Sequence, residues 1–146
     1  MRTHAPERAE ALQSGLVDIG QASAASGVSA KMIRHYEEIG LLPAVPRTVA
    51  NYRLYAPQHV QSLRFIHRAR ALGFSMDEIR DLLGLWQNRR RSSASVRKIA
   101  SAHIDELQTR IAQMQSMVDT LSHLVHCCHG DERPDCPILV DLAGED

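Results

Sequence analysis

Two cysteines separated by seven residues carry the clearest chemistry of the chain. Cys128 and Cys136 flank the polar stretch HGDERPD, which can fold back and bring both thiols to one ion. Thiolates are soft ligands that select Cu(I), zinc or other thiophilic metals over Mg or Ca. Two sulfurs with no obligatory third ligand suit a linear site for a monovalent ion, whereas a Zn(II) site usually has four ligands. The spacing indicates a monovalent-metal site, and the alternative is a pair of buried free cysteines.

Further donors surround this pair. Cys127 directly precedes Cys128, and His123, His126 and His129 recur every three residues. Three cysteines within ten residues are not a disulfide scaffold and indicate metal or redox chemistry. Cys127 is either a small apolar residue at a helix end or an extra ligand. With a histidine such as His129 it would complete a zinc site.

A second chemistry is carried by basic residues near the N-terminus. Lys31, Arg34 and His35 share the exposed face of a helix predicted over 30–39, with apolar residues behind them. Long donors on such a face reach guanine edges or phosphates in a DNA groove. The alternative is a solvated basic face.

The segment 47–55 is predicted to be a small hairpin or wing, with a turn at Asn51. It carries Arg47, Tyr52 and Arg53, side chains that suit contacts to DNA phosphates.

The net charge of zero conceals an asymmetry. Residues 17–98 contain 13 Lys or Arg and 6 Asp or Glu, whereas residues 99–146 contain 2 and 9. A basic module joined to an acidic one is typical of a polyanion-binding domain with an appended control or assembly region.

Helix signals divide the basic module into helix pairs. An apolar period from Ile19 stops at Gly27, and Ser29 caps the next helix, so that the two form a helix-turn-helix. Pro57 opens a third helix and Ser75 begins a capping box for a fourth.

A long helix is predicted over about 95–125. Its apolar positions follow a near-heptad seam: Ile99, Ala102 or His103, Leu107, Ile111, Met114, Val118, Leu121 and Val125. A helix of about 45 Å outruns a module of some eighty residues, so a second copy is the economical way to bury the seam. The alternative is packing on the helix's own domain.

Composition sets the remaining limits. The 146 residues are 44% hydrophobic, 23% charged and 4% aromatic, which are globular values. No apolar run is long enough for a membrane span or a signal peptide, so we expect a cytoplasmic protein. No catalytic constellation stands out, so we expect no enzyme. The predicted fold is mainly α, with a flexible tail (1–16), a winged helix-turn-helix domain (17–92), a coiled-coil dimerisation helix (93–126) and a metal-binding loop with a short helix (127–146).

Three segments resemble MerR-type transcription regulators. Residues 33–41, IRHYEEIGL, resemble that family's IRYYEExGL signature, residues 51–55, NYRLY, resemble its wing, and residues 63–79 resemble its next helix pair. The resemblance implies an antiparallel homodimer that controls a promoter. It also implies that six residues contact DNA: Lys31, Arg34, Tyr36, Arg47, Tyr52 and Arg53. His35 departs from the pattern, since Tyr or Phe is usual there.

The thiol loop is similar to that of the family's copper-efflux branch. Mercury and zinc regulators carry a ligand cysteine at the start of the long helix, where this chain has Ser93. The resemblance implies a sensor of Cu(I), and also of Ag(I) or Au(I), that activates copper-efflux genes. Metal loading would distort promoter DNA so that RNA polymerase can start. The alternatives are a Zn(II) or other divalent-metal regulator that uses Cys127 or a histidine, and a metal buffer or carrier that never binds DNA.

Overall fold

The computed structural model describes residues 7–88, 90–128, 130 and 136–144, and these are helical or lie in connecting loops. The described chain forms seven helices: α1 (Arg8–Gln13), α2 (Ile19–Ser26), α3 (Ala30–Glu38), α4 (Pro57–Ala71), α5 (Met76–Gln87), α6 (Ser93–Cys127) and α7 (Pro137–Ala143). They belong to two compact units, Met1–Val96 and Arg97–Asp146. The mainly α fold is therefore as predicted.

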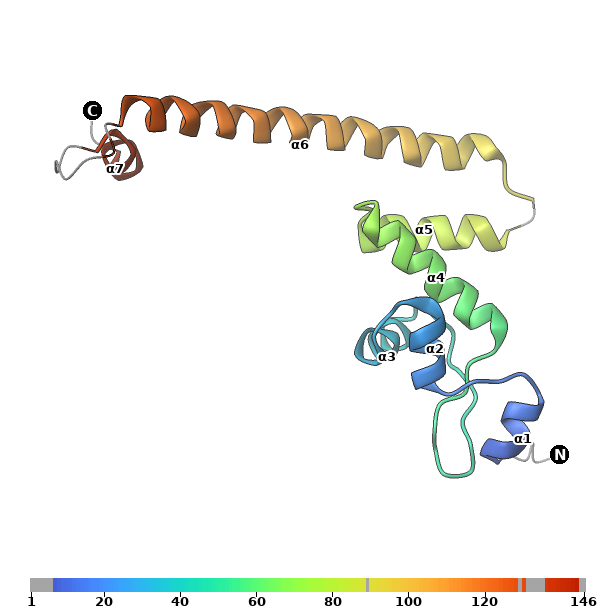
Figure 1. Ribbon diagram of the computed structural model, residues 1–146. Helices are drawn as coiled ribbons and strands as arrows, with labels where there is room; N and C mark the ends of the chain where they lie inside the picture. Colours follow the sequence, from blue (N-terminus) through green and yellow to red (C-terminus); the bar gives the residue numbers. More distant parts are fainter. Residues whose placement is uncertain (1–6, 89, 129, 131–135, 145–146) are drawn as a thin grey trace. The chain divides into compact units, whose positions relative to one another are not determined.

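Helices α2 and α3 form the predicted helix-turn-helix (Figure 1). Asp18 caps α2 by accepting a hydrogen bond from the Gln21 backbone N–H at 2.9 Å. Gly27 ends the helix with φ +79°, a left-handed conformation that glycine adopts without a Cβ penalty. Ser29 then accepts from the Met32 N–H and begins α3. The predicted start and stop signals are confirmed at these positions.

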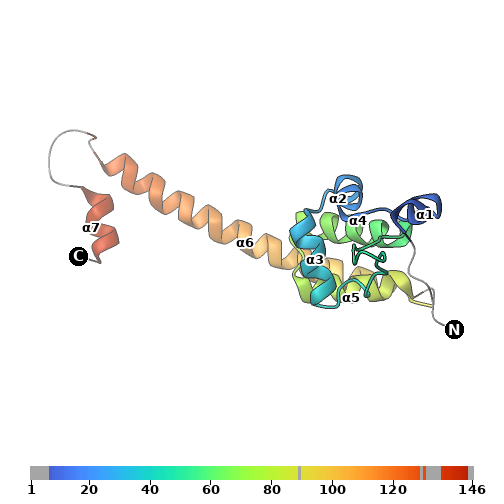
Figure 2. The ribbon, with the colours of Figure 1, turned by 90° about the horizontal axis from the view of Figure 1, so that it is seen from below.

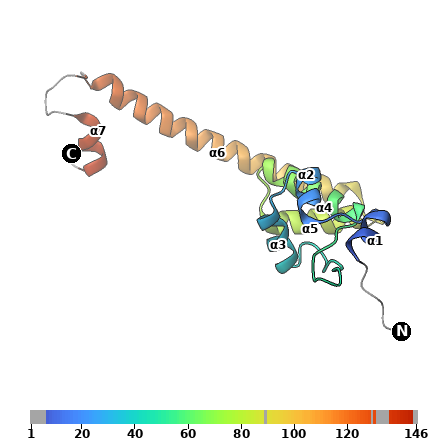
Figure 3. The ribbon, with the colours of Figure 1, turned by 60° about the horizontal axis from the view of Figure 1, so that its bottom comes forward.

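The connection between α3 and α4 forms the wing, visible as the extended loop in Figure 3. It is held by an antiparallel bridge between Arg47 and Arg53, and a second bridge joins Tyr55 to Val17. Asn51 takes φ +68° at the tip, as the predicted turn requires. In the described residues the hairpin consists of isolated bridges rather than continuous strands, because few residues lie on either side of the turn.

Helices α4 and α5 complete the first unit. In Figures 1 and 2, α4 lies beside α2, and α5 follows on from α4. The Nδ1 atom of His59 accepts the Ala56 N–H at the start of α4, and Ser75 and Glu78 form the predicted capping box of α5. The centre of the unit is filled by fully buried aliphatic side chains from three helices: Ile33, Leu63, Ile66 and Ile79. Burying each of them contributes about 1.5–3 kcal/mol.

Most of α6, followed by α7, makes up the second unit. The 35 residues of α6 span about 52 Å at 1.5 Å per residue. Much of the predicted apolar seam faces solvent, with exposed side chains at Ile111, Met114, Val118, Leu121 and Val125. Pro137 opens α7 as predicted. No helix among the described residues is both long enough and apolar enough to cross a bilayer.

One segment differs from the expected flexible tail over 1–16. Residues 8–13 form the short helix α1, which ends before Gly15 at φ +81°. The sequence RAEALQ consists of strong helix formers, and the Glu10 carboxylate accepts the Glu7 N–H at the start of the turn. Propensity thus forms a local helix where no sustained apolar period was present. Residues 1–6 lie outside the described part of the chain.

Candidate DNA-binding face and thiol site

The second helix of the helix-turn-helix presents a basic outer face. Lys31, Arg34 and His35 are exposed on α3, whereas Ile33 and Tyr36 are buried beneath them. This is the arrangement that the sequence predicts. It holds long donors outward on a helix whose inner face is fixed by the core.

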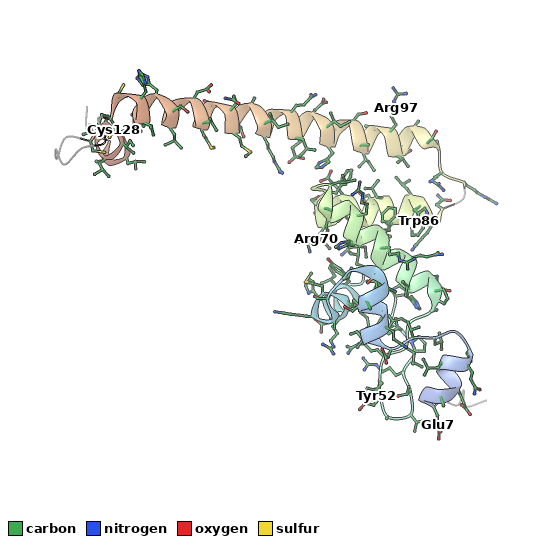
Figure 4. All side chains as sticks on the ribbon, in the orientation of Figure 1. Glu7, Tyr52, Arg70, Trp86, Arg97 and Cys128 are labelled. Carbon is green, nitrogen blue, oxygen red and sulfur yellow. The ribbon has the colours of Figure 1, made fainter. Side chains whose placement is uncertain are left out.

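Tyr36 occupies a different environment from the other predicted DNA-contacting residues. Its side chain is 2% exposed, and its hydroxyl accepts a hydrogen bond from Arg70 Nη1 at 3.1 Å. Arg70 is an exposed residue of α4, labelled in Figure 4. The phenol therefore packs in the core of the unit, and its hydroxyl is hydrogen-bonded to the Arg70 guanidinium. Sequence reasoning missed Arg70, which lies 34 residues from its partner and carries no local signal.

The wing holds its polar side chains in two ways. Tyr52 is 66% exposed and lies on the wing loop (Figure 4). Arg53 Nε forms an ion pair with Glu37 Oε2 at 2.9 Å, and both side chains are largely buried. The pair ties the wing to α3 and orients the guanidinium, whose remaining N–H groups stay available to an acceptor. Arg47 is half-buried and donates to the Asn51 carbonyl at 3.4 Å.

A buried phenol and imidazole lie beneath the wing. Burial raises the pKa of Tyr55, and the carboxylate of Glu37 raises that pKa further. Burial lowers the pKa of His59, so its ring stays neutral and Nδ1 remains free to cap α4. The Tyr55 phenol and the His59 imidazole are therefore uncharged at neutral pH.

The thiols lie at the end of α6 and the start of α7. Cys128 and Cys136 are free and half-buried, and the first follows α6 directly (Figure 4), whereas the second directly precedes α7. Cys127 is exposed in the last turn of α6, and its Sγ lies 3.8 Å from His123 Nε2. Among the described side chains, no group of three or more candidate ligands includes a cysteine. Residues 129 and 131–135, including the predicted extra ligand His129, lie outside the described residues.

Ser93 is the first residue of α6, and Cys128 follows the last one. A helix of this length separates the two positions in one chain by about 50 Å. One chain therefore cannot bring Ser93 to its own thiols. A site that combines them needs a second copy.

Comparison with known families decides the identity of the fold. Residues 17–85 match the family model "MerR HTH family regulatory protein", and residues 60–124 match "MerR, DNA binding". The chain belongs to the MerR family. As a MerR-family member it is a DNA-binding transcription regulator and not an enzyme, as the sequence predicted.

Several MerR-type proteins are similar over most of the chain. The HTH-type transcriptional regulator HmrR of Sinorhizobium medicae is 53% identical over 127 residues, which cover 87% of this chain and 86% of the relative. Heavy metal-dependent transcription regulator 2 of Rhizobium meliloti is 52% identical, again covering 87% and 86%. The regulator CueR of Salmonella typhimurium is 36% identical, covering 88% and 93%.

A solved structure supports the same fold. The transcription regulator PbrR691 from Ralstonia metallidurans, crystallised with lead(II), superposes with a TM-score of 0.75 at 32% identity. The match covers 86% of this chain and 98% of that chain. This chain and PbrR691 thus share their fold over most of both lengths.

Proposed function

We propose that this MerR-family regulator senses Cu(I), and also Ag(I) or Au(I), through Cys128 and Cys136 and activates copper-efflux genes. The observation that carries the proposal is the donor set. Two half-buried free thiols flank one loop, and the start of α6 carries Ser93 instead of a third thiol. The names of two relatives support metal control, since one is a heavy metal-dependent regulator and another is CueR.

Charge favours a monovalent ion at this donor set. Two thiolates around a +1 ion leave a net charge of −1, and a third thiolate would suit a +2 ion better. Thiolates are soft ligands, and soft ligands select Cu(I). Cys128 and Cys136 would hold the ion, and the loop between them would fold around it. Binding releases the thiol protons, so metal affinity rises with pH.

An antiparallel homodimer would complete the site. The exposed apolar seam of α6 can be buried against the same seam of a second copy, as in a coiled coil. An antiparallel pairing places the start of one α6 beside the end of the other, which brings Ser93 of one chain toward Cys128 of its partner. The dimer also presents two winged units to DNA, as a two-fold symmetric site requires.

Metal would act by shifting the dimer between two conformations. Docking of α7 against α6 around the bound ion would move the two DNA-binding units of the dimer relative to each other, and promoter DNA would be distorted so that RNA polymerase can start. The ion changes the equilibrium only by the ratio of its affinities for the two conformations. Because promoters and the polymerase are cytoplasmic, we propose the same location for this protein.

A divalent-metal regulator is the second candidate. A protein of similar structure, PbrR691, was crystallised with lead(II), so a protein of this fold can bind a divalent ion. In this candidate Cys127 or a histidine would join Cys128 and Cys136. The variant Cys127→Ser tests the form of this candidate in which Cys127 is the extra ligand, because it abolishes the metal response only if Cys127 is a ligand of the sensor site.

Transcription in vitro tests the proposal directly. Genomic DNA fragments that the protein retains, and that contain a promoter, are placed before a reporter and transcribed with purified RNA polymerase, with and without Cu(I). We expect Cu(I) to activate transcription with the wild type, and Cys128→Ser and Cys136→Ser each to abolish activation while DNA binding persists. Unchanged activation in both variants would contradict the assigned ligands.

The DNA arm has its own control. We expect Arg34→Ala to weaken binding to the selected DNA at fixed salt, whereas Glu38→Ala, which removes an exposed acid on the same helix, does not. If Arg34→Ala leaves binding unchanged, the assignment of Arg34 to the DNA contact is wrong.

A further inference from the structure

The last turn of α6 holds a second pair of metal-binding side chains. His123 and Cys127 are both exposed and lie four residues apart, and Nε2 of the imidazole is 3.8 Å from Sγ. Residues four apart on an α-helix are neighbours on one face. The contact is a weak hydrogen bond between thiol and imidazole. We propose that His123 and Cys127 form a separate site for Zn(II) or a similar divalent ion.

The separation of the two ligand atoms fits binding of both to one ion. With Zn–S of about 2.3 Å and Zn–N of about 2.05 Å, a tetrahedral angle places nitrogen and sulfur about 3.6 Å apart. A linear arrangement with the same bond lengths would place them about 4.3 Å apart. The observed 3.8 Å lies between these two values, so both atoms can reach one ion after small side-chain adjustments. A mixed nitrogen and sulfur donor set suits Zn(II), whereas the two thiols of Cys128 and Cys136 suit a monovalent ion.

Helix geometry keeps this site apart from the neighbouring thiol. Successive residues of an α-helix are rotated by about 100°, and Cα–Cβ bonds lean toward the N-terminus. The Cys127 side chain is therefore directed back toward His123, one turn earlier. Cys128 lies beyond the last helical residue and begins the loop. Adjacent cysteines thus belong to different groups of ligands.

The surroundings of the pair favour a cation. Asp119 lies one turn before His123 on the same face, and its carboxylate accepts a hydrogen bond from Gln115 Nε2 at 2.8 Å. This carboxylate adds negative charge one turn from the imidazole, which favours a bound cation. No described His, Cys, Asp or Glu brings a third ligand atom within 4.8 Å of the pair. Water completes the coordination at this exposed site, and Cys127 releases its proton to solvent on binding.

Cobalt titration tests the site in the full-length reduced protein. Co(II) replaces Zn(II) as a probe, because a thiolate bound to it gives a near-ultraviolet charge-transfer band. The titration uses a Cys128→Ser/Cys136→Ser background, which removes the proposed copper ligands. We expect one Co(II) per chain in this background, with the thiolate band, and displacement of Co(II) by Zn(II).

Three further variants in the same background decide the ligands. We expect His123→Ala and Cys127→Ser each to weaken Co(II) binding at least about tenfold, since changing even a residue that only supports a ligand costs 10–100-fold. His126→Ala, which removes the neighbouring exposed histidine, serves as the matched control and should leave binding unchanged. Binding that survives Cys127→Ser or His123→Ala, or that is absent from the background protein, would overturn the proposal. Either result leaves Cu(I) binding by Cys128 and Cys136 to be measured separately.

Discussion

The two units of the chain satisfy their apolar side chains in different ways. In Met1–Val96 the helices surround a shared interior, and Leu63 and Ile66 are completely buried. In Arg97–Asp146 one long helix carries an apolar seam on which Ile111 is 64% exposed. A single helix gains most of its stability from packing an apolar face. The first unit therefore contains its own core, whereas the second needs a partner surface to complete one.

The largest effect is expected from a charge placed in the apolar seam of α6, the surface through which the second unit is proposed to dimerise. Ile111→Asp should raise the dimer dissociation constant at least about 100-fold. Burial of one isoleucine contributes about 1.5–3 kcal/mol, and a two-fold symmetric interface loses one isoleucine from each chain. Sedimentation velocity over a range of concentrations measures the change. The control Gln113→Asp adds the same charge on the opposite face. Equal dissociation of both variants would mean that the seam is not the interface.

The next effect breaks the core of the first unit. Leu63→Ala should lower the free energy of unfolding by about 2–5 kcal/mol, because it leaves a cavity at a fully buried position. Urea denaturation measures the loss. Gln61→Ala, an exposed change on the same helix, should stay within about 0.5 kcal/mol. A small loss at Leu63 would show that this unit, too, depends on a partner.

A smaller effect concerns pH and the cap of α4. The pKa of His59 is lowered by burial in the folded unit, so the unfolded chain binds a proton more readily. The free energy of unfolding should therefore be highest above pH 6.5 and should fall as the pH drops below that value. His59→Gln keeps an acceptor for the Ala56 N–H at the start of α4. Because it removes one titrating group, it should make the free energy of unfolding depend less on pH between about pH 5.5 and 7.5.

Urea denaturation at each pH gives the slope. The exposed His35→Gln variant should retain the wild-type slope. A slope that persists in His59→Gln would assign the pH dependence to another group.

The smallest effect sharpens the account of the first unit's interior. The Tyr55 hydroxyl is buried and, among the described residues, has no hydrogen-bond partner. An unpaired buried polar group costs stability. Tyr55→Phe should therefore leave the free energy of unfolding unchanged or raise it by up to about 1 kcal/mol. Urea denaturation measures the change. If Tyr55→Phe instead lowers the free energy of unfolding by more than about 1 kcal/mol, the hydroxyl is hydrogen-bonded to a bound water.

The sequence predicts what local chemistry determines. Gly27, Ser29 and Ser75 mark helix ends because glycine tolerates a left-handed backbone and serine caps free N–H groups. The exposed basic face of α3 follows from its 3.6-residue period. These signals sit within a few residues of the structure that they produce.

Contacts between distant residues could not be predicted in this way. The Arg53–Glu37 ion pair joins residues 16 apart, and the Tyr36–Arg70 hydrogen bond joins residues 34 apart. Neither separation corresponds to a helix or strand period, so the sequence does not show that these side chains are partners. The pairing of His123 with Cys127 is visible in the sequence as an i, i+4 spacing, but the choice between this histidine and its neighbours needs the side-chain geometry.

The central claim is that Cys128 and Cys136 form a two-thiolate site for a monovalent ion. An anaerobic titration of the reduced protein with Cu(I), in competition with Zn(II), tests it most directly. The account predicts one Cu(I) per chain that Zn(II) does not displace, lost in Cys128→Ser and in Cys136→Ser and retained in Cys127→Ser. Zn(II) that displaces Cu(I) and requires Cys127 together with both other thiols would contradict it.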